Sequence, residues 1–285
     1  MKILLVSNAS AGKIRAAVLH RPRIHFSAEG RKVKIEKNLF KRAIQNNEKQ
    51  IGLWTGLANH MSMEILADSG FEWILIDMEH YPNEVPLLSG QLQALKGGTA
   101  TPIVRPPWND PVWVKRVLDQ GVFSLLFPMI QSAEEAERAV SSTRYPPKGI
   151  RGVSYNHRGN RYGRVTDYLE KIEDEICVLV QIETQKAMSR VEEIAAVDGV
   201  DGVFFGPADL SCDMGFPGQL GHPDVSALIL DGHEKVRKMG KPTGILTGIE
   251  KDAKMFIEAG MSFVAVGSDL ALLARGSEAL RAKFE

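Results

Sequence analysis

Polar side chains that could do chemistry follow directly on short apolar runs at four places in the chain. These side chains are Asp77, Glu79, His80, Arg105, Gln181, Glu183 and Asp209. In barrels of parallel strands, the groups at the carboxyl ends of the strands meet at one rim, where barrel enzymes carry out their chemistry. The spacing therefore predicts one polar site built from four different strands.

Glu183 and Asp209 are the natural pair for holding a metal ion. Two carboxylates on neighbouring strands can bind one hard divalent cation and leave its other positions to water and substrate. A structural role is the alternative for each of them, and Asp209 in particular could cap the start of a short helix. Spacing alone leaves both interpretations open.

His80 could act as a general base, because an unperturbed imidazole has a pKa of about 6.5. Asp77 and Glu79 lie close to it in the chain, and an acidic partner would orient the ring and raise its basicity. Arg105 could clamp a carboxylate with two parallel hydrogen bonds. The alternatives are a histidine simply packed at a strand end, and a salt bridge from Arg105 to one of the same two acids.

A lysine that could form a Schiff base is missing from this predicted rim. Apart from Lys241, which directly precedes the seventh predicted strand and so stands at the opposite end of a barrel, no lysine lies at the predicted strands. An imine-forming aldolase needs a desolvated lysine at the site. The pattern therefore favours activation by a metal over activation by an imine.

Eight short apolar runs alternate with amphipathic segments after residue 37. The predicted strands are 51–57, 73–79, 102–106, 124–129, 177–183, 202–206, 242–246 and 263–267. Runs this apolar are typical of parallel strands that are covered on both faces. Eight of them, each followed by a helix, predict an α/β fold with a single (β/α)₈ TIM-barrel domain over residues 37–285.

Local signals mark the ends of the predicted helices. Asp110-Pro111 is typical of a helix start, Gly121 of the end of that same helix, and Ser132 with Glu135 of a capping box. Residues 145–167 form a longer polar insertion between the fourth helix and the fifth strand. We expect that insertion to be a lid over the site or a contact between subunits.

Residues 1–36 differ from the rest of the chain. They are rich in lysine and arginine and poor in acids, and only in part do they resemble a transit peptide. We interpret them as an N-terminal extension that precedes the first strand of the barrel. Deleting this extension is expected to leave turnover intact.

The composition excludes several classes of protein. The chain has 35 basic and 35 acidic residues, so no net charge favours binding to nucleic acid or to a membrane. Its longest apolar runs fall far short of the ~20 residues that a membrane-spanning helix needs. Two cysteines are too few for a disulfide framework and indicate a reducing compartment, so we expect a cytoplasmic protein.

Seven segments, in order and with barrel spacing, closely resemble the HpcH/HpaI class II pyruvate aldolase family from about residue 38 onward. They are IGLWTGL, GFEWILIDMEHYPNEV, PIVRPPWNDPVWVKRVLDQG, RYPPKGIRGV, VLVQIET, DGVDGVFFGPADLS and FVAVGSD. Two departures flank His80, where Met78 and Tyr81 stand at positions that usually carry small residues. Both are expected to affect the aldehyde side of the site.

The resemblance implies a role for each residue of the predicted site. Glu183 and Asp209 would bind Mg²⁺, Mn²⁺ or Co²⁺, whereas Gln181, Ala208 and Asp209 would contact pyruvate. His80 would accept a proton and Arg105 would stabilise an enolate. Asp119 would increase the basicity of His80, although the residue pattern alone marks it as an ordinary helix residue. Apart from the resemblance, we expect Asp77 to be a catalytic residue, because its proximity in sequence makes it the better acidic partner of His80, and we expect Trp54 to contact the substrate.

The resemblance also implies a reaction. We expect reversible cleavage of a 4-hydroxy-2-oxo acid such as 4-hydroxy-2-oxoheptanedioate into pyruvate and succinic semialdehyde, in the catabolism of aromatic compounds. One alternative is a 2-dehydro-3-deoxyglucarate aldolase that releases tartronate semialdehyde, because residues 152–160 look more like that branch. Another is a barrel that binds a metabolite without catalysis, although a binding protein would have no need of the base His80.

Members of this family assemble from trimers, often into hexamers. The last predicted helix has an apolar side suited to packing on a neighbouring subunit, formed by Leu270, Leu272, Leu273 and Leu280. We therefore expect a homo-oligomer, either a trimer or a hexamer.

Overall fold

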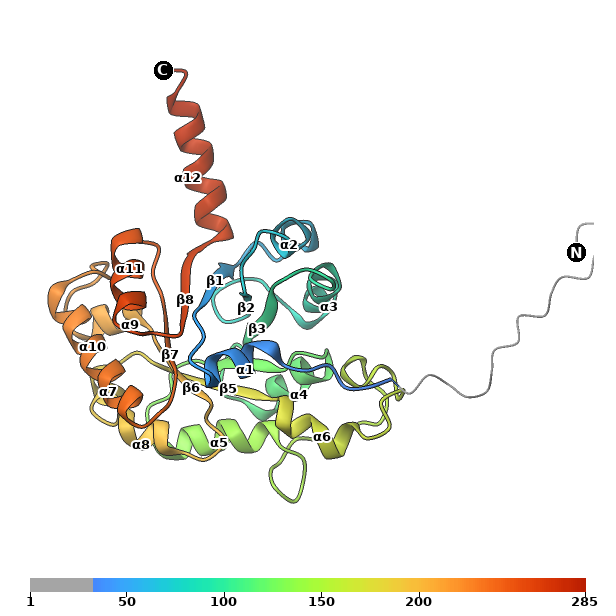
Figure 1. The fold of residues 1–285 in the computed structure, drawn as a ribbon. Helices are drawn as coiled ribbons and strands as arrows, with labels where there is room; N and C mark the ends of the chain where they lie inside the picture. Colours follow the sequence, from blue (N-terminus) through green and yellow to red (C-terminus); the bar gives the residue numbers. More distant parts are fainter. Residues whose placement is uncertain (1–32) are drawn as a thin grey trace, which may run out of the picture. The chain divides into compact units, whose positions relative to one another are not determined.

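The computed structural model describes residues 33–285, in which eight parallel strands close into a barrel (Figure 1). The strands are β1 (Gln50–Thr55), β2 (Trp73–Asp77), β3 (Thr101–Arg105), β4 (Ser124–Phe127), β5 (Cys177–Ile182), β6 (Gly202–Phe205), β7 (Thr243–Leu246) and β8 (Phe263–Ser268). Each strand pairs with the next in sequence, and β8 pairs with β1 to complete the ring. The predicted barrel is confirmed.

Helices surround the barrel and close one of its ends. They are α1 (Leu39–Gln45), α2 (His60–Ala67), α3 (Val85–Ala94), α4 (Pro111–Asp119), α5 (Ala133–Thr143), α6 (Tyr168–Glu175), α7 (Gln185–Met188), α8 (Val191–Ala196), α9 (Pro207–Asp213), α10 (Pro223–Lys238), α11 (Glu250–Glu258) and α12 (Asp269–Ala282). The predicted caps at Asp110 and Ser132 are present: Asp110 accepts from the N–H groups of Val112 and Trp113, and Ser132 accepts from that of Glu135. The capping box is not closed, because the Glu135 carboxylate accepts from the N–H of Gln131 instead. None of these helices is long and apolar enough to cross a membrane.

Along each strand, side chains point alternately into and out of the barrel. This alternation places polar groups on the inside at the rim. Leu75, Ile103 and Leu179 belong to the apolar cluster that fills the interior. Asp77, Arg105 and Gln181 follow them by two residues and are also buried. Because side chains two apart along a strand share a face, these polar groups point inward where their strands end.

Helix α1 closes the amino end of the barrel. The Phe40 ring lies 5.9 Å from that of Trp73 and 5.7 Å from that of Phe263, measured between centroids. Ile44 joins the same cluster and is fully buried. The apolar side of this short helix therefore seals the barrel interior at the end opposite the polar rim.

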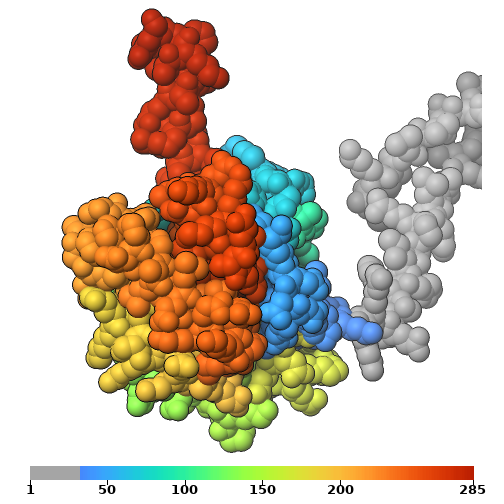
Figure 2. Space-filling model, turned by 60° about the vertical axis from the view of Figure 1, so that its left-hand side comes forward, coloured from blue at the N-terminus to red at the C-terminus, as the bar shows by residue number. Residues whose placement is uncertain are grey.

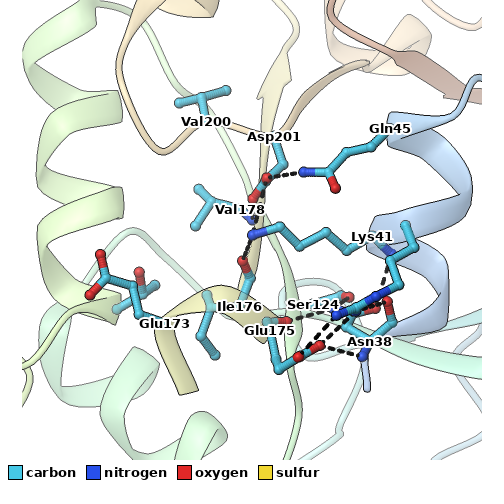
Figure 3. A network of polar contacts seen from close by, with 12 residues as sticks. Asn38, Lys41, Gln45, Ser124, Glu173, Glu175, Ile176, Val178, Val200 and Asp201 are labelled. Atoms are coloured by element: carbon cyan, nitrogen blue, oxygen red, sulfur yellow. Dashed lines mark hydrogen bonds and ion pairs between the residues drawn. The ribbon is translucent and has the colours of Figure 1, made fainter. Parts of the chain in front are cut away.

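A polar network holds α1 to the start of β4, to the end of α6 and to the residues just before β5 and β6 (Figure 3). The Asn38 side chain donates to the Ser124 hydroxyl and to the Glu175 carbonyl, and its backbone N–H donates to the Glu175 carboxylate at 2.8 Å. Arg42 and Lys37 also bind that carboxylate. Burial opposes ionisation, but these hydrogen bonds outweigh it and lower the pKa of Glu175 to about 2.

The barrel unit begins slightly before the predicted boundary. The contacts divide the chain into residues 1–32, which lie outside the described residues, and Val33–Glu285. Val33 and Ile35 pack against the core, and Glu36 forms an ion pair with Arg161. The end of the predicted extension therefore belongs with the barrel, while the dispensability of residues 1–36 stays a prediction.

The insertion at residues 145–167 lies at the amino end of the barrel. It joins the end of α5 to α6 and the start of β5, and its Arg151 and His157 contact Asp119 at the end of α4. A helix that follows a parallel strand runs back toward the amino ends of the strands. The expectation of a lid over the rim of the same barrel is therefore wrong, whereas a contact between subunits stays a prediction.

Candidate active site

Asp77 and Arg105 form the buried centre of the polar rim. The two residues are register partners on β2 and β3, so their inward side chains lie next to each other. Arg105 donates from Nε to Oδ1 at 2.9 Å and from Nη2 to Oδ2 at 2.6 Å. This is the bidentate arrangement that the guanidinium fork favours. The salt bridge considered as an alternative for Arg105 is therefore present.

Trp54 contacts both members of this ion pair. Its indole N–H donates to Asp77 at 3.1 Å, and the Arg105 guanidinium carbon lies 4.8 Å from the centre of its ring. Burial alone would raise the pKa of Asp77, but the hydrogen bonds from Arg105 and Trp54 lower it below its usual value. Asp77 thus stays ionised, and the position of the guanidinium is set on two sides.

Glu79 connects Arg105 with His80. One Glu79 oxygen lies 3.0 Å from Nη1 of Arg105 and 3.8 Å from Nε2 of His80, whose side chain is 60% exposed. Burial raises the pKa of Glu79 to about 7. The charge of Arg105 opposes this shift, and the charges of Asp77 and Asp209 add to it. Asp77 is engaged elsewhere, so Glu79 is the acid that contacts His80 within the described chain. The sequence places both acids near His80 but does not decide which of them contacts it.

Glu183 is held just beyond the end of β5. One of its oxygens accepts from the backbone N–H of Met129 at 2.8 Å, and the other accepts from the Gln181 amide at 2.5 Å. Met129 has a φ of 53°, a strained value of a kind that is often found at functional sites. Burial raises the pKa of Glu183 to about 7; the two hydrogen bonds oppose this shift, and Asp209 and Glu79 add to it.

Gly206 makes room for the Glu183 carboxylate. A Cβ atom at this position would lie 2.5 Å from Oε2 of Glu183 and 2.8 Å from its Cβ. Gly206 is also the residue from which α9 begins, so Ala208 and Asp209 follow in the first turn of that helix. The close approach of β5 and β6 at this point therefore needs a residue without a side chain.

Asp209 and Glu183 together suit a hard divalent cation. Asp209 is exposed in the first turn of α9, and its charge raises the pKa of both Glu183 and Glu79. Within residues 33–285 no cluster of three or more His, Cys, Asp or Glu side chains is placed to hold a metal. Two carboxylates that repel each other at an open rim match a site in which water and substrate supply the remaining ligands.

Comparisons with known proteins identify the family of this chain. A family profile described as HpcH/HpaI aldolase/citrate lyase matches residues 50–276. The chain belongs to the HpcH/HpaI aldolase/citrate lyase family. Aldolases are carbon–carbon lyases, so the enzyme class predicted from the resemblance is confirmed.

Individual relatives extend the comparison over most of the chain. A 4-hydroxy-2-oxo-heptane-1,7-dioate aldolase from Salmonella dublin is 55% identical over 249 residues, which is 87% of this chain and 95% of that protein. A crystal structure of an HpcH/HpaI aldolase/citrate lyase family protein from Burkholderia cenocepacia has 35% identity and a TM-score of 0.84, covering 87% of this chain and all of the other. An HpcH/HpaI aldolase from Desulfitobacterium hafniense has 29% identity and a TM-score of 0.77, covering 86% and 96%.

The Asp119 that the family resemblance pairs with His80 lies far from it along the barrel. Asp119 is the last residue of α4, at the amino ends of the strands, whereas His80 follows β2 at their carboxyl ends. Its carboxylate binds Arg151 at 2.8 Å and lies 4.0 Å from His157. A single chain therefore brings together Trp54, Asp77, Arg105, Gln181, Glu183, Ala208 and Asp209 at the rim, with His80 beside them and Asp119 at the other end.

The two unusual residues beside His80 face different ways. Met78 is buried in the cluster between strands and helices, since it follows Asp77 by one residue and points to the opposite face. Tyr81 packs against the interior cluster, and a Cβ atom on Gly56 would lie 2.7 Å from its ring. Of the two, Tyr81 is therefore the one placed to shape the site.

Proposed function

We propose that the protein is a divalent-metal-dependent aldolase that cleaves 4-hydroxy-2-oxoheptane-1,7-dioate reversibly to pyruvate and succinic semialdehyde. The observation that carries this proposal is the carboxylate pair of Glu183 and Asp209 beside the fixed Arg105 guanidinium, all at the carboxyl rim of the barrel. The 55% identity to proteins named for this substrate supports the choice of acid. A role in the catabolism of aromatic compounds is part of the same proposal.

Glu183 and Asp209 would hold the metal ion, of the magnesium, manganese or cobalt kind. When bound, the ion supplies a Lewis acid that polarises the keto oxygen of the substrate. Gln181 keeps Glu183 in place through its amide N–H, and its own Oε1 is buried without a hydrogen-bond partner. A buried acceptor of this kind is available to a ligand, which supports a contact from Gln181 to the pyruvate end.

Arg105 would stabilise negative charge as the enolate develops. Its Nε and Nη2 atoms are engaged by Asp77, and Trp54 covers the guanidinium plane. A cation held this firmly needs no reorganisation when charge appears nearby, which is the main source of electrostatic catalysis. Asp77 would therefore act on Arg105 as a positioning residue, and Glu79 would align the third guanidinium nitrogen.

His80 would take the proton from the 4-hydroxyl group, because its exposed imidazole stands next to the carboxylate site. Asp119 could raise the basicity of His80 only from another chain, since the two lie at opposite ends of one barrel. We therefore propose that the pair forms between subunits, with Arg151 holding Asp119 in place.

The C-terminal helix supports assembly into a trimer or hexamer. Helix α12 projects from the body of the barrel unit, as Figure 2 shows, and Asp269 is its single buried residue. Leu272, Leu273 and Leu280 are each more than half exposed. Covering this apolar side requires a partner, for which a second copy of the chain is our proposal. We place the assembly in the cytoplasm because Cys177 and Cys212 are both free.

The test follows two reactions of purified enzyme: release of pyruvate from the dicarboxylate, and exchange of deuterium into the methyl group of pyruvate. His80→Ala should lower cleavage by about 10² to 10⁴ and spare more of the exchange. Arg105→Lys should lower both, because lysine keeps the charge but lacks the planar fork. Lys254→Gln, which breaks the exposed ion pair between Lys254 and Glu250 on α11, is the matched control.

Several outcomes would contradict these roles. Equal loss of exchange and cleavage in His80→Ala, together with normal rates in Arg105→Lys, would show that the two residues are wrongly assigned. A preference for tartronate semialdehyde over succinic semialdehyde in the synthetic direction would move the substrate to the glucarate branch. A borohydride-trapped adduct of pyruvate on any lysine would exclude the metal mechanism.

A further inference from the structure

A cavity lies at the amino end of the barrel, away from the active-site rim. Its volume is about 620 Å³, and it is bordered by residues 34–39, by the connection between α3 and β3, and by the loop 158–165. Pockets of about 300 to 1,000 Å³ are typical for small organic ligands. Leu95, Pro102, Phe123 and Val165 contribute an apolar lining.

The charged residues at this cavity are nearly all basic. They are Lys34, Lys37, Lys96, Arg158 and Arg161, with Glu36 as the single acid. Lys37 is paired with Glu175, and Arg161 with Glu36. Lys34, Lys96 and Arg158 have no carboxylate partner within residues 33–285. Three cations without a carboxylate partner in the described part of the chain therefore line the cavity.

Arg158 is the best positioned of these cations. It is half-buried, and its guanidinium donates to the backbone carbonyl of Gln120 at the end of α4. Burial lowers its pKa. A partly desolvated guanidinium with unused donors is a strong site for an anion, since charge-assisted hydrogen bonds gain strength where water is excluded.

The two loops around the cavity have unusual backbone geometry. Arg161 and Tyr162 both have a φ of 55°, and Gly163 follows with a φ of 78°, which makes three successive left-handed residues. On the other side, Gly98 packs so closely that a Cβ atom would lie 2.4 Å from the Ala67 carbonyl oxygen. The left-handed residues persist only where surrounding contacts maintain them. The loop at 161–163 and the closely packed Gly98 therefore both hold the walls of the cavity in place.

We propose that this cavity binds a small organic anion. Its apolar body would lie against Leu95, Pro102 and Phe123, and its acidic group would face Arg158 and Lys96. The proposal does not depend on the aldolase reaction, because none of these residues belongs to the rim. Within one chain the cavity and the rim lie at opposite ends of the barrel, so a ligand bound here would leave that chain's own rim free.

The test is a fluorescence titration of the intact protein with anilinonaphthalene sulfonate, an organic anion with an aromatic body, in the presence of saturating pyruvate and Mg²⁺. Lys96→Gln and Arg158→Gln should each weaken binding about tenfold, as expected for the loss of one charge-assisted hydrogen bond. Lys254→Gln, which removes an exposed lysine on α11, should leave the affinity unchanged. Benzoate and phenyl phosphate should displace the probe, and their relative potency identifies the preferred acidic group.

Lys96 is exposed, so its substitution should not disturb folding and keeps the test decisive if Arg158→Gln is unstable. Equal affinity in wild type and Lys96→Gln, or an equal loss in the Lys254→Gln control, would overturn the proposal. Displacement of the probe by pyruvate would place it at the active site instead. A change of oligomeric mass in Lys96→Gln would make the cavity a contact between subunits.

Discussion

At the scale of single residues, Glu183 should make metal binding depend on pH. Its pKa without metal is raised to about 7 by burial, with Asp209 and Glu79 adding to the shift. A divalent cation binds the ionised carboxylate, so below pH 7 a proton must leave first. We expect the affinity for Mn²⁺ to fall by up to about tenfold per pH unit below 7 and to be constant above 8.

Calorimetric titration of Mn²⁺ into metal-free enzyme between pH 5.5 and 8.5 measures this effect. Glu183→Gln should have low affinity and little pH dependence, and a chelator should abolish pyruvate release until a divalent ion is added. An affinity in the wild type that is the same at pH 5.5 and pH 8 would contradict the assigned ligand.

Gly206 should be needed for the metal site because of the room it leaves. A methyl group there would meet Glu183 Oε2 at 2.5 Å, so Gly206→Ala should displace the carboxylate and weaken Mn²⁺ binding by about tenfold or more. Gly248→Ala is the matched control, since a Cβ atom at that position has no neighbour within 4 Å. If both variants bound Mn²⁺ as well as wild type, the contact between Gly206 and Glu183 would not matter for the metal.

At the scale of secondary-structure elements, Glu175 should stabilise the docking of α1 in a pH-dependent way. Its folded-state pKa is about 2, below the ordinary value of 4.5 for a glutamate. The stabilisation is therefore complete above about pH 5 and is lost as the pH falls toward 2. Glu175→Gln should lower the free energy of unfolding by about 2 to 3 kcal/mol at pH 7.

Thermal unfolding followed at pH 7, 5 and 3 tests this prediction. The difference in melting temperature between wild type and Glu175→Gln should be largest at pH 7 and should shrink at pH 3. Glu250→Gln breaks an exposed pair on α11 and should change the melting temperature little at any of these pH values. A constant difference between wild type and Glu175→Gln would mean that the carboxylate charge does not hold α1.

At the scale of the whole molecule, the separation of His80 and Asp119 predicts complementation between chains. His80→Ala and Asp119→Asn should each be weakly active alone. If the two variants are unfolded, mixed in equal amounts and refolded together, about one quarter of the sites would combine an intact His80 with an intact Asp119 from a neighbour. Pyruvate release should then rise well above that of either variant.

Two measurements complete the complementation test. Sedimentation should show that the mixture has the same oligomeric mass as wild type. Activity in the mixture no higher than the average of the two pure variants would mean that the pair does not form between chains. A monomeric mass at micromolar concentration would contradict the assembly itself.

The sequence by itself determined the barrel and the contents of its rim. Each strand is an apolar run, and where it starts and ends is set by residues adjacent to it in the sequence. The eight predicted strands therefore lie close to the observed ones. The two-residue alternation then directs Asp77, Arg105 and Gln181 inward. Helix caps such as Asp110 were equally predictable, because the capping hydrogen bonds span only two or three residues.

The tertiary structure alone decided which polar groups contact one another. Asp77 and Glu79 are equivalent by spacing, but strand register gives Asp77 to the bidentate bond with Arg105 and leaves Glu79 beside His80. The direction of α4 carries Asp119 to the other end of the barrel, although the chain between β3 and Asp119 is short. These contacts join segments distant in sequence, and their distances depend on barrel closure and helix direction, which no local pattern encodes.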